Sequence, residues 1–535
     1  MNTFERTECA TNADCSAFGE ASACLPEGFC SGTTGGAGGS SGECSTNQEC
    51  VTTQGDFHIC RKSDFTCVPL LTNLCTSIDG DYVDDNAFII GSIGPVEGED
   101  ASTGRSELNA IELAANDFAK AANGLPARPG TTGRRPYVVI GCNDNGDTPT
   151  GVDAAKHLAN TVQVPAIIGA AYSGITISMS TEVTIPAGVL TISPSATSVA
   201  LTDLDDKGLV WRTSPSDIFQ GAALAQYAPR VEDEVRDTEI IPAVDPISFT
   251  ILHKGDAYGE GLAKALEAKL VINGKPALDA SNSENYTRFN YGDPDNPSQS
   301  PLKYGEAVTT AIGRRSHIIA VFGTSEAIND VIVQIENQWD TGSPPSYRPR
   351  FIGSDGVLTT ALWDAVSKNN GLRKRITGSV PGTNNPLFQV FKSDFTAKYN
   401  DGVSSPDVFG AAGAFDAAYL LAFATVANGD RPETGANLAE ALKRMVPPGE
   451  SKSAAANDIS ATFQLLSAGK NVDFNGASGP LNFDVETGEA PSDVIIWCMP
   501  SDASGNATAG IASGYFFDAA KDALGGTEFG SQCKF

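Results

Sequence analysis

The sequence predicts an α/β protein with two doubly wound lobes, each built on a parallel sheet, preceded by a small disulfide-rich segment. Two observations predict this class. From about residue 87 onward, apolar stretches of strand length alternate with helical patterns, which is typical of parallel sheets with helices on both faces. Before residue 80, eight of the twelve cysteines fall between Cys9 and Cys67. That stretch has few apolar residues, so we expect disulfides to stabilise it.

The Cys-rich segment, residues 1–80, contains a repeat. TECATNADC (7–15) and GECSTNQEC (42–50) share the pattern E-C-x-T-N-x-x-C, and a Gly/Ser-rich linker separates the two copies. We therefore expect one module at 9–30 and a second at 44–67. The pairing within each module stays open. Zinc is the weaker alternative, because the segment has no Cys-x2-Cys pair and His58 is the only histidine nearby.

The alternating region predicts more strands than one compact sheet holds, and the pattern changes near residues 215–245. In doubly wound sheets, ligands bind beyond the carboxyl ends of the strands. Polar loops follow predicted strands at AAYSG (170–174), after residue 193, and at GSDG (353–356). The expected strands are 87–94, 137–142, 165–170, 188–193, 247–253, 317–323 and 350–356, and the expected helices are 106–122, 150–162, 174–184, 259–271 and 325–338.

Composition narrows the class of partner. The 535 residues carry a formal net charge of −29 and a sequence pI of about 4.4. This negative charge argues against nucleic acid or an anionic membrane surface as a binding partner, because both bind to a basic surface on a protein. No apolar run approaches the length of a membrane span, so we expect no direct membrane insertion of this chain.

The cysteine density favours an oxidising compartment. The start, MNTFERTECATNADC, has neither the basic nor the apolar region of a signal peptide. We therefore expect an exported protein of the periplasm or cell surface whose export signal is not in this sequence. A lipid anchor through a removed N-terminal signal is one form that export can take.

Several separated motifs occur in the order of a known family. They are the block from Ile168 to Gly221, which begins IGAAYSG, then ILHKGDAYGEGLAKAL (251–266), FIGSDG (351–356) and GPLNFD (479–484). Over roughly 85–520 the chain resembles the type I periplasmic binding proteins. The resemblance is to the leucine/isoleucine/valine-binding proteins and to the ligand-binding ectodomains of metabotropic glutamate receptors. The Cys-rich segment lies outside it.

The resemblance implies two lobes joined by three hinge crossovers, with a ligand held between lobes that close around it. It places lobe 1 at about 85–215 plus 382–472, and lobe 2 at about 218–380 plus 475–535. Cys75 with Cys142, and Cys498 with Cys533, are the pairings we expect outside the modules.

The resemblance also implies a clamp for a zwitterion. Hydroxyls and free N–H groups near a helix start suit a carboxylate, and carboxylates with an aromatic ring suit an ammonium group. Each residue has a local alternative, such as a helix cap for Ser195, Thr197 or Asp217 and a turn for Asp355. The residues implied are Ser173, Ser195, the backbone of Ala196, and Thr197 for the carboxylate, and Asp217, Tyr258 and Asp355 for the ammonium.

We expect no enzyme, and therefore no catalytic residue, cofactor or metal. The sequence has no G-x-S-x-G nucleophile elbow between a strand and a helix, no H-E-x-x-H and no P-loop. The histidines, at 58, 157, 253 and 317, lie beside no candidate nucleophile. The acidic loop CNDNGDT (142–148) lacks the downstream glutamate of a calcium loop. Arg105 is expected in solvent and Arg212 in a structural ion pair.

The sequence therefore predicts an exported solute-binding protein that captures an amino acid or a close analogue for ABC-type uptake. The partners expected are a small-molecule ligand and a membrane permease or signalling protein, and no nucleic acid. Two alternatives stay open: a ligand-sensing receptor module, and a surface adhesion or scaffold protein without a small ligand. The ligand side chain, transport against sensing, and the oligomeric state are not fixed by the sequence.

Overall fold

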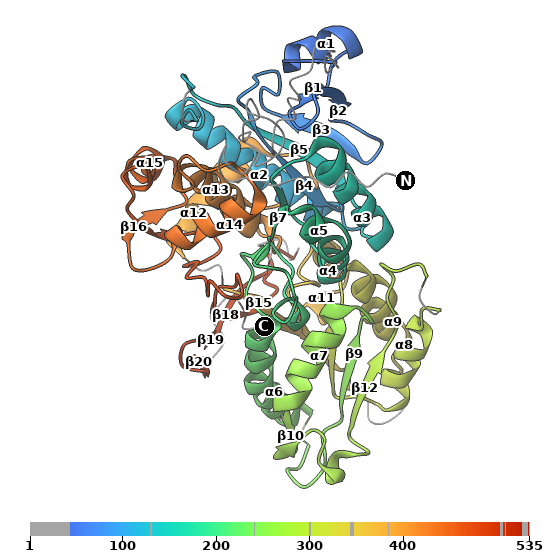
Figure 1. Ribbon diagram of the computed structural model, residues 1–535. Coiled ribbons are helices and arrows are strands. Elements are labelled where there is room, and N and C mark those ends of the chain that lie inside the picture. Colours follow the sequence, from blue (N-terminus) through green and yellow to red (C-terminus); the bar gives the residue numbers. More distant parts are fainter. Residues whose placement is uncertain are drawn as a thin grey trace.

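The computed structural model describes residues 43–128, 131–239, 241–298, 301–342, 347–382, 385–502, 507–508, 510–526 and 533. The first cysteine module therefore lies outside the described residues. A six-stranded and an eight-stranded sheet organise two lobes that lie one above the other in Figure 1. Helices cover both faces of each sheet, so the predicted α/β class is confirmed.

The sheet of lobe 1 is parallel except at one edge. Its strands are apolar and buried on both faces, as parallel strands between two helix layers must be. The antiparallel edge strand is β3, which belongs to the Cys-rich segment. The spatial order is β3 (Cys75–Asp79), β5 (Tyr137–Asn143), β4 (Phe88–Gly94), β6 (Ala166–Ile168), β7 (Leu190–Ser193) and β8 (Val210–Arg212).

Two helical layers enclose this sheet. One layer contains α13, whose small and apolar residues are almost all buried against α2 and the sheet. It comprises α2 (Ala101–Ala122), α12 (Pro386–Lys398), α13 (Ala411–Ala427), α14 (Gly435–Leu442) and α15 (Ile459–Ser467), with the small parallel pair β16 (Glu450–Ser453) and β17 (Val472–Asn475). The other comprises α3 (Thr148–Lys156), α4 (Ser173–Met179) and α5 (Ile185–Ala187), with the π-helical turns His157–Val162 and Ser180–Thr184 between them.

Lobe 2 has a mixed sheet. Five parallel strands continue into three antiparallel ones contributed by the C-terminal part of the chain, which the repeating βα pattern does not foreshadow. The order is β12 (Tyr286–Asn290), β9 (Phe249–His253), β13 (Ile318–Phe322), β14 (Arg350–Gly353), β15 (Ile376–Pro381), β18 (Val494–Cys498), β19 (Ile511–Asp518) and β20 (Ala523–Gly525).

The helices of lobe 2 again form two layers. α6 (Asp217–Glu239) and α7 (Ala257–Lys269) pack on one face, and the remaining helices pack on the other. These are α8 (Tyr304–Gly313), the π-helical turn Ala327–Ile332, α9 (Val333–Gln338), α10 (Thr360–Lys368) and α11 (Asn370–Arg373), and a short hairpin, β10 (Val271–Ile272) with β11 (Lys275–Pro276), extends the lobe. The chain passes between the two sheets after β8, after β15 and after β17.

The second cysteine module is a small unit at the outer edge of lobe 1. It consists of α1 (Asn47–Gln54) and the hairpin of β1 (His58–Arg61) with β2 (Thr66–Pro69). Thr46 and Glu49 form a capping box at the start of α1. Within the module Cys44 pairs with Cys60 and Cys50 with Cys67, and the two expected bridges, Cys75–Cys142 and Cys498–Cys533, are also present.

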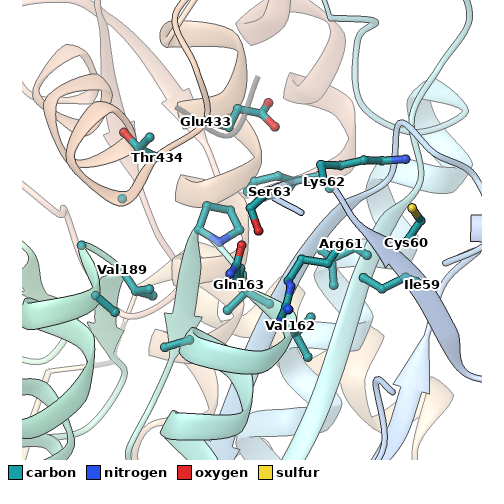
Figure 2. Close-up of a pocket in the computed structure, with 18 of the residues that line it drawn as sticks. Ile59, Cys60, Arg61, Lys62, Ser63, Val162, Gln163, Val189, Glu433 and Thr434 are labelled. Carbon is teal, nitrogen blue, oxygen red and sulfur yellow. The ribbon is translucent and has the colours of Figure 1, made fainter. Parts of the chain in front are cut away.

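A pocket separates the module from lobe 1 (Figure 2). Residues 59–63 of the module form one side, and Val162, Gln163, Val189 and Glu433 belong to the opposite walls. The charged groups around it are paired: Arg61 binds Asp64, and Glu433 binds Arg128 and Arg135. No helix within the described ranges combines the length and apolar character needed to cross a bilayer.

Candidate functional site

A cavity lies between the two lobes where the loops at the carboxyl ends of both sheets meet. Its volume is about 480 Å³, counting the solvent space at its opening. The lining residues are Thr103, Ala171, Tyr172, Ser173, Ser195, Lys254, Asp256, Tyr258, Thr324, Asp355, Gly356, Leu358, Thr359, Val408 and Phe409. Four of the predicted clamp side chains, Ser173, Ser195, Tyr258 and Asp355, therefore line one cavity.

Lobe 1 contributes two hydroxyls. Ser173 is the first residue of α4, where backbone N–H groups have no partner within the helix, and its Oγ accepts a hydrogen bond from the Ser198 N–H. Ser195 follows β7, and its Oγ lies 3.0 Å from the Ala171 carbonyl oxygen. Both hydroxyls lie at the ends of neighbouring parallel strands, β6 and β7, so strand order explains their proximity.

Glu107 of α2 stands directly behind Ser195. Its Oε1 lies 2.6 Å from the Ser195 Oγ, and the side chain is 3% exposed. Burial and, to a smaller extent, the charge of Asp144 raise the Glu107 pKa to about 8. A hydroxyl has one proton, so Ser195 satisfies both Ala171 and Glu107 only when the Glu107 carboxyl is protonated and donates to Ser195 Oγ.

Gly410 permits this packing. It has a φ of +97°, and a Cβ placed on it would come within 2.2 Å of Glu107 Oε1 and 2.9 Å of the Ser195 Cβ. A larger residue at this position would displace the pair. The loop that ends at Gly410 therefore lies in contact with the hydroxyl side of the cavity.

Ala196 and Thr197 lie behind the cavity wall. The Ala196 N–H donates to Ser193 Oγ, and its carbonyl accepts from Arg212 and Ser214. Both polar backbone groups of Ala196 are therefore used inside the protein, and the structure does not offer them to a ligand as the resemblance implied. Thr197 is fully buried, and its hydroxyl has no hydrogen-bond partner among the described residues.

Lobe 2 contributes a buried carboxyl held in a defined position. The Tyr258 hydroxyl donates to Asp355 Oδ1 at 2.8 Å, and the Gln220 amide donates to the same oxygen at 2.7 Å. Tyr258 also lies 2.7 Å from Ser354 Oγ. The Tyr258 ring thus forms part of the cavity wall while its hydroxyl fixes Asp355, which is 3% exposed.

Asp217 joins this group through Gln220, which was not predicted. The Gln220 amide lies 3.3 Å from Asp217 Oδ1, and the Ser379 hydroxyl donates to its carbonyl at 2.7 Å. One amide therefore bridges two buried carboxyls. Asp217 is the first residue of α6 and does not line the cavity itself.

The two carboxyls raise each other's cost of ionisation. Burial raises the Asp217 pKa well above its ordinary value, and the charge of Asp355 raises it further, whereas Arg212 lowers it. Burial also raises the Asp355 pKa. Arg212 neutralises little of this negative charge, because it is paired with Glu489 at 2.5 Å, the structural role expected of it. An added positive group near Asp355 would stabilise both ionised carboxyls.

Lys254 is a buried cation in the cavity wall that sequence reasoning missed. Its ammonium pairs with Asp295, lies 3.6 Å from Asp256, and sits 5.1 Å from the centre of the Tyr172 ring. Burial lowers the Lys254 pKa, but the charges of Asp295 and Asp256 outweigh burial, and the pKa lies well above its usual value. Because Tyr172 belongs to lobe 1, this contact crosses the cleft.

Two further contacts join the lobes. Ser198 Oγ donates to the Ala257 carbonyl at 2.8 Å, and the Thr148 N–H donates to the Asp295 carbonyl at 2.9 Å. These bonds couple the loops after β7 and β5 to the loops after β9 and β12. The lobes are thus in direct contact around the cavity.

Buried acidic groups dominate the surroundings. Asp100, Asp144 and Asp256 each carry a buried oxygen without a hydrogen-bond partner among the described residues. Burial raises the pKa of Asp144 to about 7 and also raises that of Asp100. The site as a whole favours a ligand with a positive group over one that is only an anion.

The remaining candidates play no part in the cavity. Arg105 is exposed and donates to the Val96 carbonyl, in keeping with the expectation that it faces solvent. Within the described ranges, the side chains that meet metal-binding geometry are Cys44, Cys50 and Cys60, and all three are in disulfides. The described chain thus offers no free metal centre.

Comparison with known proteins agrees with this architecture. Residues 88–274 match the family described as "Periplasmic binding protein". The substrate-binding protein BasB of a chemotactic signal transduction system from Halobacterium salinarum is 26% identical over 73% of this chain and 83% of its own length. An amino acid binding protein from Pseudomonas aeruginosa is 25% identical over 51% of this chain and 62% of its own length.

Solved structures share the fold at low identity. The branched-chain amino acid transporter substrate-binding protein LivJ from Streptococcus pneumoniae, in complex with isoleucine, covers 80% of this chain and 99% of its own at 19% identity, with a TM-score of 0.56. A solute-binding protein of an ABC transporter from Rhodopseudomonas palustris was solved in complex with 3,4-dihydroxybenzoic acid. The match covers 81% of this chain and 98% of that protein at 16% identity, with a TM-score of 0.58.

These relatives are solute-binding proteins and not enzymes, and their family implies an extracytoplasmic location. Residues 88–274 therefore match the periplasmic binding protein family, and the chain has the type I fold of the solved branched-chain amino acid binding proteins.

Proposed function

We propose that this protein captures a free α-amino acid, or a close analogue, in the interlobe cavity and delivers it to an ABC-type importer. One observation carries the proposal. The hydroxyls of Ser173 and Ser195 come from lobe 1, and the carboxyl of Asp355, fixed by Tyr258, comes from lobe 2, and all four side chains line the same cavity. The hydroxyl donors of lobe 1 match the carboxylate of a zwitterion, and the Asp355 carboxyl of lobe 2 matches its ammonium group.

Each end of the ligand has its own partners. The ligand carboxylate accepts hydrogen bonds from Ser173 and from Ser195, whose single proton turns from the Ala171 carbonyl to the ligand, and the ammonium group pairs with Asp355 beside the Tyr258 ring. Asp217 adds negative charge through the Gln220 bridge. Because the two ends are held by different lobes, only the closed arrangement satisfies both, so the ligand favours closure.

The relatives support an amino-acid ligand. One curated relative is an amino acid binding protein, and LivJ was solved with isoleucine. The structure solved with 3,4-dihydroxybenzoic acid suggests a second class, a carboxylate without an ammonium group. The paired buried carboxyls of Asp217 and Asp355 favour the amino acid, because they would repel a ligand that is only anionic.

A sensing role is the second candidate function. The Halobacterium salinarum relative belongs to a chemotactic signal transduction system, so a signalling protein is an alternative recipient of the closed form. The same cavity serves both roles. Attachment to the membrane by a lipid also remains a prediction, which fractionation of the native protein would test.

A thermal-shift screen tests the proposal. The purified, oxidised protein is scanned with the common amino acids, small amides and 3,4-dihydroxybenzoate, each at millimolar concentration. A ligand at 1,000 times its dissociation constant adds about 4 kcal/mol to the free energy of unfolding. We expect an α-amino acid to stabilise the wild type and not Asp355→Ala. Stabilisation by the benzoate alone would refute the zwitterion clamp, and no stabilisation at all would favour the scaffold alternative.

A further inference from the structure

A second chamber adjoins the interlobe cavity on the hinge side. Leu358, Val408 and Phe409 line both spaces, so these three side chains form a shared wall between them. The second chamber has a volume of about 1,250 Å³, counting the solvent space at its opening. The loop that provides Val408 and Phe409 is the one that ends at Gly410 against Glu107 and Ser195.

The chamber has both polar and apolar surface and draws on both lobes. Buried Val380, Ile495 and Trp497 come from the hinge strands β15 and β18, and buried Phe388 comes from α12 of lobe 1. Its charged groups are Lys392 and Asp407, which pair with each other at 2.6 Å. The lining therefore offers no unpaired charge to a ligand and instead offers apolar surface.

One polar group inside the chamber is unsatisfied. Thr213 is 4% exposed and lines the chamber, yet its hydroxyl has no hydrogen-bond partner in the described part of the chain. Gly413 keeps the space beside it open, because a Cβ there would lie 2.6 Å from Thr213 Oγ1. A buried hydroxyl without a partner costs free energy, so the corner beside Thr213 suits a water molecule or a polar ligand atom, whereas the apolar lining elsewhere suits an alkyl chain.

The placement of the clamp directs the ligand toward this chamber. Ser173, Ser195, Tyr258 and Asp355 form polar walls of the cavity, and the shared wall is its apolar side. An amino acid held at both charged ends has only its side chain left to contact that wall. A short side chain would reach only the wall of Leu358, Val408 and Phe409. The apolar surface of the second chamber would then stay in contact with water.

We propose that the chamber receives the far part of the ligand's side chain, and that the ligand is an α-amino acid with a long apolar side chain. This inference rests on the proposed function, because the clamp sets the position of the head group. Such a side chain enters the chamber between Leu358, Val408 and Phe409, which therefore have to move apart when a long ligand binds. The chain thus selects by side-chain length and not only by the zwitterion.

A homologous series tests the inference by calorimetry. The ligands are L-alanine, L-norvaline, L-norleucine and L-2-aminooctanoic acid. In the wild type we expect the affinity to rise roughly fourfold for each methylene that is buried, through the whole series. Ala512→Trp fills the chamber from an exposed position of β19 that lines it. This variant loses the gain for the longest ligands and binds L-alanine unchanged.

Ala523→Trp is the matched control, because Ala523 is exposed on β20 and lines neither space. It should reproduce the wild-type series. If the wild-type affinity falls beyond L-norvaline, or if Ala512→Trp retains the full gain, the chamber inference is overturned while the proposed function stands. If no member of the series binds while another α-amino acid of the thermal-shift screen does, the inference is overturned and the proposed function stands. If no α-amino acid binds, both fail.

Discussion

Replacing Asp355 with asparagine separates two consequences of one buried charge. In the complex, the carboxylate is the partner of the ligand ammonium, and removing one partner of a buried ion pair costs about 3–5 kcal/mol. At about 1.4 kcal/mol per tenfold change in affinity, this is a loss of roughly 100- to 4,000-fold. Asparagine keeps the acceptor oxygen for Tyr258 and Gln220, so local geometry is conserved.

Without ligand, the same substitution acts in the opposite direction. The pKa values of Asp217 and Asp355 are raised in the folded protein from an ordinary value of 3.8. The folded state therefore holds more protons than the unfolded state above about pH 4, and stability falls as the pH rises through the raised pKa values. Asp355→Asn removes one titrating group and its repulsion, so we expect a flatter decline and a more stable unliganded protein at neutral pH.

Calorimetry with the ligand found in the screen, and thermal unfolding without ligand between pH 5 and 8, measure the two effects. Asp364→Asn is the control, because Asp364 is an exposed carboxylate of α10. A dissociation constant of Asp355→Asn within about threefold of the wild type would refute the assignment of the ammonium to Asp355. A loss of unliganded stability would show that burial of this charge does not oppose folding as argued.

Three further predictions follow from the described contacts. In the Glu107→Gln variant the amide donates to Ser195 at every pH, so the ligand affinity of this variant should stay constant above pH 8. The affinity of the wild type should decline there as the Glu107 carboxyl ionises. Parallel pH profiles of affinity for the two proteins would contradict this. Lys254→Met leaves buried carboxylates unpaired and should lower the free energy of unfolding in denaturant by about 3–5 kcal/mol, and an unchanged midpoint would argue against it. Cys75→Ser with Cys142→Ser opens a bridge spanning 67 residues and should cost about 4 kcal/mol in the same assay, unless strand pairing alone holds the edge of lobe 1.

Local patterns predicted the fold class, and the resemblance to the type I binding proteins supplied the four clamp side chains that line the cavity. The βα alternation identifies seven of the strands in the two sheets, and the loops around Ser173, Ser195 and Asp355 follow three of them. The predicted strands are β4, β5, β6, β7, β9, β13 and β14. Parallel strands place their carboxyl ends at one edge, so residues distant in sequence become neighbours. The C-terminal strands β18 to β20 break the alternation and were not expected as an antiparallel extension.

The supporting residues could not be predicted, because their roles depend on tertiary packing. Glu107 lies on a long amphipathic helix, and nothing in that helix marks its contact with Ser195, 88 residues away. Gln220 reads as an ordinary residue one turn into α6, yet it links carboxyls 138 residues apart, at 217 and 355. Lys254 stands beside Asp256 in the quoted motif, but only the fold brings Asp295 and Tyr172 to it.

The edge strand β3 has a mechanical consequence. It joins the Cys-rich segment to the sheet of lobe 1 by strand pairing with β5 and by the Cys75–Cys142 bridge, and Arg61 of the module donates to the Thr161 carbonyl of the same lobe. The second module and lobe 1 thus move as one body. A partner that binds the module therefore also holds lobe 1. Under the proposed function, closure around the ligand is then a movement of lobe 2 relative to that partner. A partner that distinguishes the loaded from the unloaded protein has to touch lobe 2, either alone or together with the stationary frame.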